Sequence, residues 1–143
     1  MSALRFDVGA VRLTRISYAE VGVPPEVVGL TPEQVASVEW GEPLWVGGGD
    51  VKAAAAVWII ETGDARIAVD PAQAADDILR SEADAGAHQT AFAALLTAAG
   101  FPRESITHAI ATHAEGVGMW AWRTDDGAWV PFFPNAEILV DQR

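Results

Sequence analysis

The segment PRESITHAIATHAEGVG, residues 102–118, decides how this chain is expected to fold. Within it, Ile106 to Thr112 predicts a short strand that leads directly into His113, and two glycines mark a backbone turn shortly afterwards. Glu115 follows His113 by two residues. A histidine with a carboxylate is a legitimate ligand pair for zinc or iron, and the alternative for His113 is a strand-end histidine that is hydrogen-bonded to the backbone. His113 and Glu115 are therefore the candidate metal ligands.

A predicted hairpin lies upstream of this segment. Ala53 to Glu61 is an apolar run that is typical of a strand buried on both faces. Thr62-Gly63-Asp64 predicts a hairpin-type turn, and Arg66 to Val69 predicts a second strand that ends at Asp70. Two interpretations of Asp70 stay open. It is either a carboxylate that orients a nearby site or the start of an Asx-type turn.

Strand and helix alternate through the rest of this region. A loop is expected over residues 72–86, and Gln89 to Ala99 predicts an amphipathic helix, with a glycine as its stop. Residues 119–123 are expected to form one or two helical turns, and residues 138–140 a final strand. This alternation predicts an α/β protein.

The first 50 residues have weaker signals. Phe6 to Tyr18 predicts a strand with an irregularity, and Thr31-Pro32-Glu33 predicts the capped start of a short helix or turn. With 143 residues, the chain has the length of one domain. We expect a single domain over residues 1–143, with irregular strands in residues 1–50 and the motif-bearing part in residues 51–143.

Composition excludes several classes of function. Half of the residues are hydrophobic, which is enough to bury a core. The 9 basic and 20 acidic residues give a formal net charge of −11. A chain this acidic is repelled by nucleic-acid phosphates and by anionic membranes. We therefore expect neither nucleic acid nor a membrane as a partner.

The chain has no cysteine, which excludes disulfides, thiolate metal sites and cysteine nucleophiles. Its first residues lack an apolar core of the length that a signal peptide needs. The longest apolar run, Ala53 to Ile60, is far shorter than the ~20 residues needed to span a bilayer. A soluble, cytoplasmic protein is the expectation.

The order of these elements resembles the N-terminal half of the metallo-β-lactamase superfamily. A hairpin ends in Asp70, a helix follows, and a strand leads into Thr112-His113. Val117-Gly118 matches the end of the family motif, and Asn135 to Val140 resembles the strand after it. The resemblance covers residues 51–143. It implies an α/β fold (α+β by some schemes), an αββα sandwich of which this half supplies one mixed sheet with flanking helices.

The resemblance also assigns roles to residues. Asp70 matches the aspartate that supports the metal site, and His113 matches the first histidine of the family's His-x-His-x-Asp-His motif. The motif is degenerate here, because only His113 and one carboxylate, Glu115, remain. Glu115 would be a ligand or would orient the attacking water. Zinc or iron would then be bound weakly, or not at all, by this chain alone.

The resemblance implies a divergent metal-dependent hydrolase, or a fragment of one, acting on an ester, thioester, lactone or amide of a small molecule. The alternative is a non-catalytic binding or assembly module that has lost its metal site. Half of the sandwich would expose the apolar inner face of its sheet. We therefore expect either a homo-oligomer or a separate C-terminal half-domain as the partner of this surface.

Other chemistry-bearing residues have plainer interpretations. His108 is expected to be structural and His88 solvated. No serine-hydrolase pattern appears in the sequence. An aromatic cluster follows the motif and is compatible with a substrate pocket, with core packing or with an interface. Its members are Trp120, Trp122, Trp129, Phe132 and Phe133.

Overall fold

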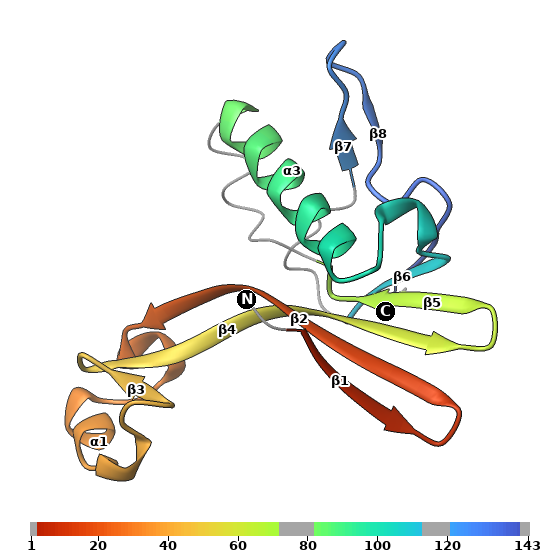
Figure 1. The fold of residues 1–143 in the computed structure, drawn as a ribbon. Helices are drawn as coiled ribbons and strands as arrows, with labels where there is room; N and C mark the ends of the chain where they lie inside the picture. The colour runs from red at the N-terminus through yellow and green to blue at the C-terminus, as the bar shows by residue number, and fades with distance from the viewer. Residues whose placement is uncertain (1–2, 72–81, 113–120, 141–143) are drawn as a thin grey trace. The chain divides into compact units, whose positions relative to one another are not determined.

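The computed structural model describes residues 3–71, 82–112 and 121–140. The chain divides into two compact units, residues 1–18 with 56–143, and residues 19–55. In chain order the described elements (Figure 1) are β1 (Ala3–Val8), β2 (Val11–Val23), η1 (Pro25–Val28), α1 (Pro32–Ala36), η2 (Glu39–Gly41), β3 (Val46–Gly47), β4 (Asp50–Thr62), β5 (Ala65–Val69), α3 (Glu82–Ala98), η3 (Arg103–Ser105), β6 (His108–Ala111), β7 (Ala121–Arg123), β8 (Trp129–Pro131) and β9 (Glu137–Val140).

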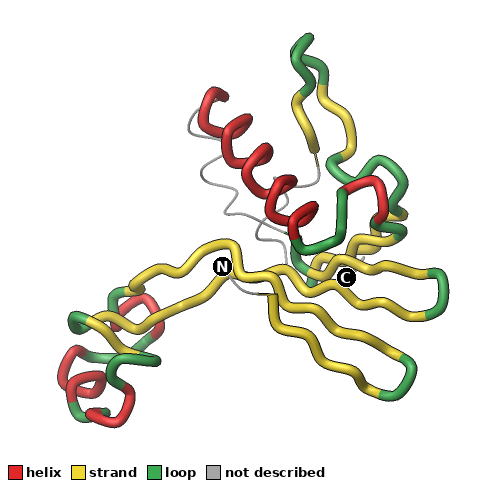
Figure 2. The backbone as a smooth tube through the Cα atoms, in the orientation of Figure 1, coloured by secondary structure: helices red, strands yellow, loops and turns green. Residues whose placement is uncertain are grey.

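Figure 2 draws all described strands in yellow. Seven of them form one sheet. Its order is β1-β2-β4-β5-β6-β9, and β3 pairs with β4. The β1–β2 and β4–β5 pairs are antiparallel, whereas β5–β6 and β6–β9 are parallel. Parallel neighbours need a crossover connection, and α3 lies between β5 and β6 in the chain. The mixed sheet that the sequence predicted is therefore present.

The hydrophobic core of the larger unit lies between α3 and one face of the sheet (Figure 1). Phe92 and Leu96 are four residues apart, hence on one side of α3, and both are almost fully buried. Val57 and Ile59, two residues apart on β4, are fully buried and point to this helix-covered face. The other members of the core are Ile16, Ala68, Phe101, Ile106, Ala109, Phe132 and Phe133.

The opposite face of this sheet has no such cover in the described part of the chain. Trp58 lies between Val57 and Ile59 on β4, so its side chain points away from the core, and it is 36% exposed. The prediction that this strand is buried on both faces is therefore wrong at Trp58. The strand is apolar on both faces, but α3 covers one of them.

In the smaller unit, α1 begins where the sequence predicted. The Thr31 hydroxyl accepts a hydrogen bond from the Gln34 backbone N–H, and the Gln34 side chain accepts one from the Thr31 N–H at 2.8 Å. Pro32 is the first helical residue, where its missing N–H costs nothing.

Within the described ranges, no helix has both the length and the apolarity needed to cross a bilayer.

Three local predictions were wrong. The single strand expected near the N-terminus is two strands joined at Gly9, whose φ of 62° suits a tight turn. The helix α3 begins at Glu82, inside the loop predicted over residues 72–86, because its alanine-rich first half favours helix without an amphipathic signal. Residues 121–123 form a strand rather than helical turns, because they pair with residues 129–131.

Candidate functional site

Asp70 joins the ends of strands β5 and β6. Its backbone N–H donates to the carbonyl oxygen of Ile110 at 2.8 Å, which extends the strand pairing by one residue past β5. Its carboxylate accepts two hydrogen bonds from Thr112, one from the backbone N–H at 2.7 Å and one from the hydroxyl at 2.6 Å. We call these two hydrogen bonds the Asp70–Thr112 clamp. The clamp fixes the residue that directly precedes His113 in the sequence.

An aspartate suits the backbone at this position. The φ of Asp70 is 49°, in the left-handed region that most side chains avoid. Aspartate and asparagine enter this region more readily than other non-glycine residues, because their short polar side chains bond locally. The carboxylate of Asp70 is also the acceptor that Thr112 uses. This geometry shows that Asp70 orients Thr112, and its role at a metal site or in catalysis stays a prediction.

The predicted metal ligands His113 and Glu115 lie outside the described residues. Within residues 3–71, 82–112 and 121–140, no group of three or more His, Cys, Asp or Glu side chains is placed to hold a metal ion. The Asp70 carboxylate is already bonded to Thr112. The assignment of His113 and Glu115 as metal ligands therefore stays a prediction. His113 and Glu115 alone are fewer than the three protein ligands of a typical catalytic zinc.

Tyr18 of β2 lies within electrostatic range of Asp70. Its half-buried ring meets Phe92 edge-on, with the ring centroids 5.3 Å apart. Burial raises the pKa of the Tyr18 phenol above its ordinary value of 10.0, and the negative charge of Asp70 raises it further. Sequence reasoning did not select Tyr18. The sequence feature that could have indicated Tyr18 is its spacing: Thr14, Ile16 and Tyr18 are two residues apart, which places all three on one face of β2.

A spectroscopic titration tests the proximity of these two groups. Tyr18 is the only tyrosine in the sequence, so the phenolate absorbance band reports on it alone. We expect a midpoint above pH 10.0 in the native chain and a lower one, still above that value, in Asp70→Asn. A raised native pKa means that the phenol's contribution to stability is complete below pH 10 and is lost as pH rises through the folded pKa. Identical midpoints in the two proteins would contradict an electrostatic effect of Asp70 on Tyr18.

His108 has its own hydrogen-bond partner and lies within the sheet. His108 Nδ1 shares a 2.8 Å hydrogen bond with the Thr107 hydroxyl. In the sheet, His108 pairs with Ile67 on one side and Glu137 on the other. These contacts support the structural role expected for His108. The side chain of His88, on α3, lies outside the described residues.

The aromatic cluster is divided between core and surface. Phe132 and Phe133 are buried in the core, with ring centroids 4.8 Å apart. Trp122 is half-buried and packs on Phe132 at 5.8 Å. Trp129 is 53% exposed, and Trp120 lies outside the described residues. The core interpretation therefore holds for the two phenylalanines, and Trp129 belongs to the surface.

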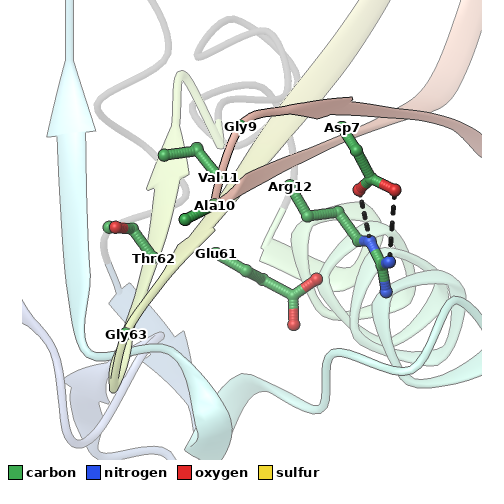
Figure 3. A pocket seen from close by; sticks show the side chains of 8 residues that line it. All are labelled: Asp7, Gly9, Ala10, Val11, Arg12, Glu61, Thr62 and Gly63. Atoms are coloured by element: carbon green, nitrogen blue, oxygen red, sulfur yellow. Dashed lines mark hydrogen bonds and ion pairs between the residues drawn. The ribbon is translucent and has the colours of Figure 1, made fainter.

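A shallow cavity of about 340 Å³ lies at the hairpin tips of the larger unit, at the opposite end of β5 from Asp70 (Figure 3). No sequence pattern predicted this cavity. Arg12 forms an ion pair with Asp7 at 2.8 Å beside the cavity, and this hydrogen bond lowers the pKa of the Asp7 carboxyl. Both partners are exposed, so their mutual attraction is weak in water. The cavity is lined by Asp7, Gly9, Ala10, Val11, Arg12, Glu61, Thr62 and Gly63.

No known family model and no curated protein matches the sequence. Solved structures do match the fold. The hydrolase AbOPH of the beta-lactamase superfamily superposes with a TM-score of 0.64 at 19% identity, over 95% of this chain and 43% of that one. AidC, a dizinc quorum-quenching lactonase solved with a product, gives 0.67 at 15% identity, over 95% and 43%. A probable metal-dependent hydrolase from Staphylococcus aureus gives 0.65 at 14% identity, over 96% and 49%.

These likenesses show the fold. The described mixed sheet and its helix have the architecture of a metallo-β-lactamase-like domain, in agreement with the resemblance seen in the sequence. The chain spans less than half the length of each of these solved proteins. Identities below 20% are too low to carry an activity or a substrate from those proteins to this chain.

Proposed function

We propose that this chain forms the N-terminal half of a divergent metal-dependent hydrolase that acts on an ester, thioester, lactone or amide of a small molecule. The single observation that carries the proposal is the Asp70–Thr112 clamp. It fixes the backbone directly before His113, where the sequence resembles a metal-binding motif. The matched structures described as a dizinc lactonase and as metal-dependent or beta-lactamase-superfamily hydrolases support the reaction class.

Each candidate residue has a distinct role in this proposal. His113 is a metal ligand, and Glu115 is either a ligand or the group that orients the attacking water. A bound zinc or iron ion would supply a Lewis acid that activates water for attack on a carbonyl carbon. Asp70 acts as a positioning residue, because its two bonds to Thr112 restrict the backbone that leads to His113. Further ligands have to come from another polypeptide or from a longer form of this chain, since catalytic zinc usually has three protein ligands.

Metal content tests the proposal directly. The native chain, purified after growth with added zinc and iron, should retain metal at partial occupancy, because this chain alone supplies few ligands, and His113→Ala should lose that metal because one of those ligands is gone. His108→Ala is the matched control: it removes a histidine five residues earlier in the chain that bonds to Thr107, and should leave the metal content unchanged. Less than about 0.1 metal ion per folded native chain would overturn the proposal.

The alternative, a binding or assembly module without a metal, is favoured by the motif itself. His113-Ala114-Glu115-Gly116 keeps one histidine where the resemblance implies three. In that case the clamp would only stabilise the ends of two parallel strands. A native chain that is fully folded, free of metal and unaffected by His113→Ala would favour this alternative.

A further inference from the structure

A glutamine lies in the apolar row of α3. Gln89 lies three residues before Phe92 and seven before Leu96, hence on the same side of the helix. Phe92 and Leu96 belong to the core, and Gln89 is buried as fully as they are, with 1% of its surface exposed. A buried amide without a hydrogen bond costs far more free energy than an apolar side chain. A glutamine at this position is therefore explained by the groups that it bonds.

One partner of Gln89 is the first residue of β7. The side-chain Nε2 of Gln89 donates a hydrogen bond to the backbone carbonyl oxygen of Ala121 at 2.5 Å. The helix α3 contacts β7, and the two elements lie side by side in Figure 1. Because the acceptor is a backbone atom, the bond fixes the position of the chain itself at Ala121.

The residue after Ala121 is held as well. The ring of Trp122 packs on Phe132, and the Arg103 guanidinium lies 4.5 Å from the centre of the Trp122 ring. A guanidinium at this distance is attracted to the π face of an indole. Phe132 itself is fully buried in the core. The start of β7 is therefore fixed at two consecutive residues, one bonded to α3 and the other packed on the core.

These contacts and the clamp flank the candidate metal motif. The Asp70–Thr112 clamp holds the residue before His113, and the Gln89 amide holds Ala121. The two candidate ligands lie between these anchors in the sequence. Holding both ends of a chain segment removes conformations that a bound ion would otherwise have to remove by itself. The gain in affinity from such preorganisation matters most where few ligands hold the ion.

We propose that Gln89 is a positioning residue for the candidate metal site. Its amide anchors Ala121 and thereby fixes the second end of the segment 113–120, as Asp70 fixes the first. The metal-binding part of this inference rests on the proposed function. The anchoring part does not, because the hydrogen bond to Ala121 belongs to the folded chain whether or not it binds a metal.

Limited proteolysis with a glutamate-specific protease tests the anchor without a metal. Gln89→Met removes the amide donor and keeps an unbranched side chain of similar length and helix propensity. We expect cleavage after Glu115, identified by mass spectrometry, to be about fivefold faster in this variant, because one hydrogen bond that opposes local opening is lost. If Gln89→Met lacks the native circular dichroism spectrum, Gln89→Leu repeats the test.

Leu96→Val is the matched control for both variants. It removes one methylene group from a fully buried side chain on the same helix and leaves the bond to Ala121 in place. Its effect on stability is therefore global. Cleavage after Glu115 should stay within about twofold of the native rate, because local opening does not require the whole chain to unfold.

A cobalt titration tests the positioning role. Co²⁺ binds the same kinds of ligand as Zn²⁺, and its visible absorption reports how much of it is bound. We expect the dissociation constant for Co²⁺ to rise about three- to tenfold in Gln89→Met, because the ion must then order one end of the segment itself. In Leu96→Val it should stay within about twofold. A purely structural role for Gln89 would move both variants alike.

Two results would overturn the inference. One is cleavage after Glu115 that Gln89→Met does not accelerate, or that Leu96→Val accelerates equally. The other is a dissociation constant for Co²⁺ that is the same in Gln89→Met and the native chain. Faster cleavage in Gln89→Met of a chain that binds no cobalt would support the anchor and count against the proposed hydrolase function, so the two can fail separately.

Discussion

Replacing Phe132 with alanine is expected to lower the free energy of unfolding by about 3–5 kcal/mol, the cost of emptying a large buried aromatic site. Phe132 is fully buried, and its ring lies 5.6 Å from Phe92, 5.8 Å from Trp122 and 4.8 Å from Phe133. The backbone is held as well, because Arg103 Nη1 donates to the Phe132 carbonyl oxygen at 3.1 Å. The surroundings therefore have little freedom to collapse into the cavity. Urea unfolding at a fixed protein concentration measures the loss.

Two further variants show whether the loss of stability comes from emptying a buried site or from removing an aromatic ring. Trp129→Ala removes a larger ring from a side chain that is 53% exposed, and should cost less than about 1 kcal/mol. Phe132→Leu keeps most of the buried volume and should cost about 1–2 kcal/mol. Equal losses in Phe132→Ala and Trp129→Ala would show that Phe132 is not the core residue that its burial indicates.

Replacing Asp70 with alanine is expected to lower the free energy of unfolding by about 2–3 kcal/mol, because two hydrogen bonds to a charged acceptor are lost. Thr112 loses the acceptor for both its N–H and its hydroxyl. Alanine also enters the left-handed region, where Asp70 has a φ of 49°, less readily than aspartate. The same urea titration measures this loss.

Asp70→Asn is the matched control for this change. Asparagine tolerates the left-handed backbone and keeps one carbonyl acceptor, so we expect it to cost about 1 kcal/mol. Thr112→Val removes the hydroxyl bond and keeps the backbone bond. The double-mutant cycle of Asp70→Ala with Thr112→Val should give a coupling of about 1 kcal/mol. Strictly additive losses would mean that the hydroxyl bond contributes nothing.

Elements set by local chemistry were predicted well. The turn predicted at Thr62-Gly63-Asp64 is found at Gly63-Asp64, between β4 and β5, and the helix that begins after Thr31 has the expected cap. In both cases the deciding residues are neighbours in the sequence, so their conformational preferences were readable without the rest of the fold. Residues 121–123 were misjudged for the opposite reason. Their strand depends on pairing with residues 129–131, which a local pattern does not reveal.

The candidate site was only partly predictable. Asp70 was selected from its position after an apolar strand, but its partner is Thr112, 42 residues later, and only the parallel pairing of β5 with β6 brings them together. Tyr18 was overlooked because its closeness to Asp70 depends on the order β2-β4-β5 in the sheet. The apolar character of β4 on both faces predicts a surface in need of a partner; Trp58 is exposed on that surface, and the partner stays a prediction.

Asp70 holds Thr112, the residue before the candidate ligand His113, and amide hydrogen exchange at Thr112 tests this clamp most directly. The Thr112 N–H donates to the Asp70 carboxylate at 2.7 Å, so its exchange should be slow in the native chain. In Asp70→Ala we predict that Thr112 exchanges at nearly the unprotected rate while the amides of β6 remain protected, which distinguishes local release from unfolding. Thr112 protection that is equal in the two proteins would show that Asp70 does not hold Thr112.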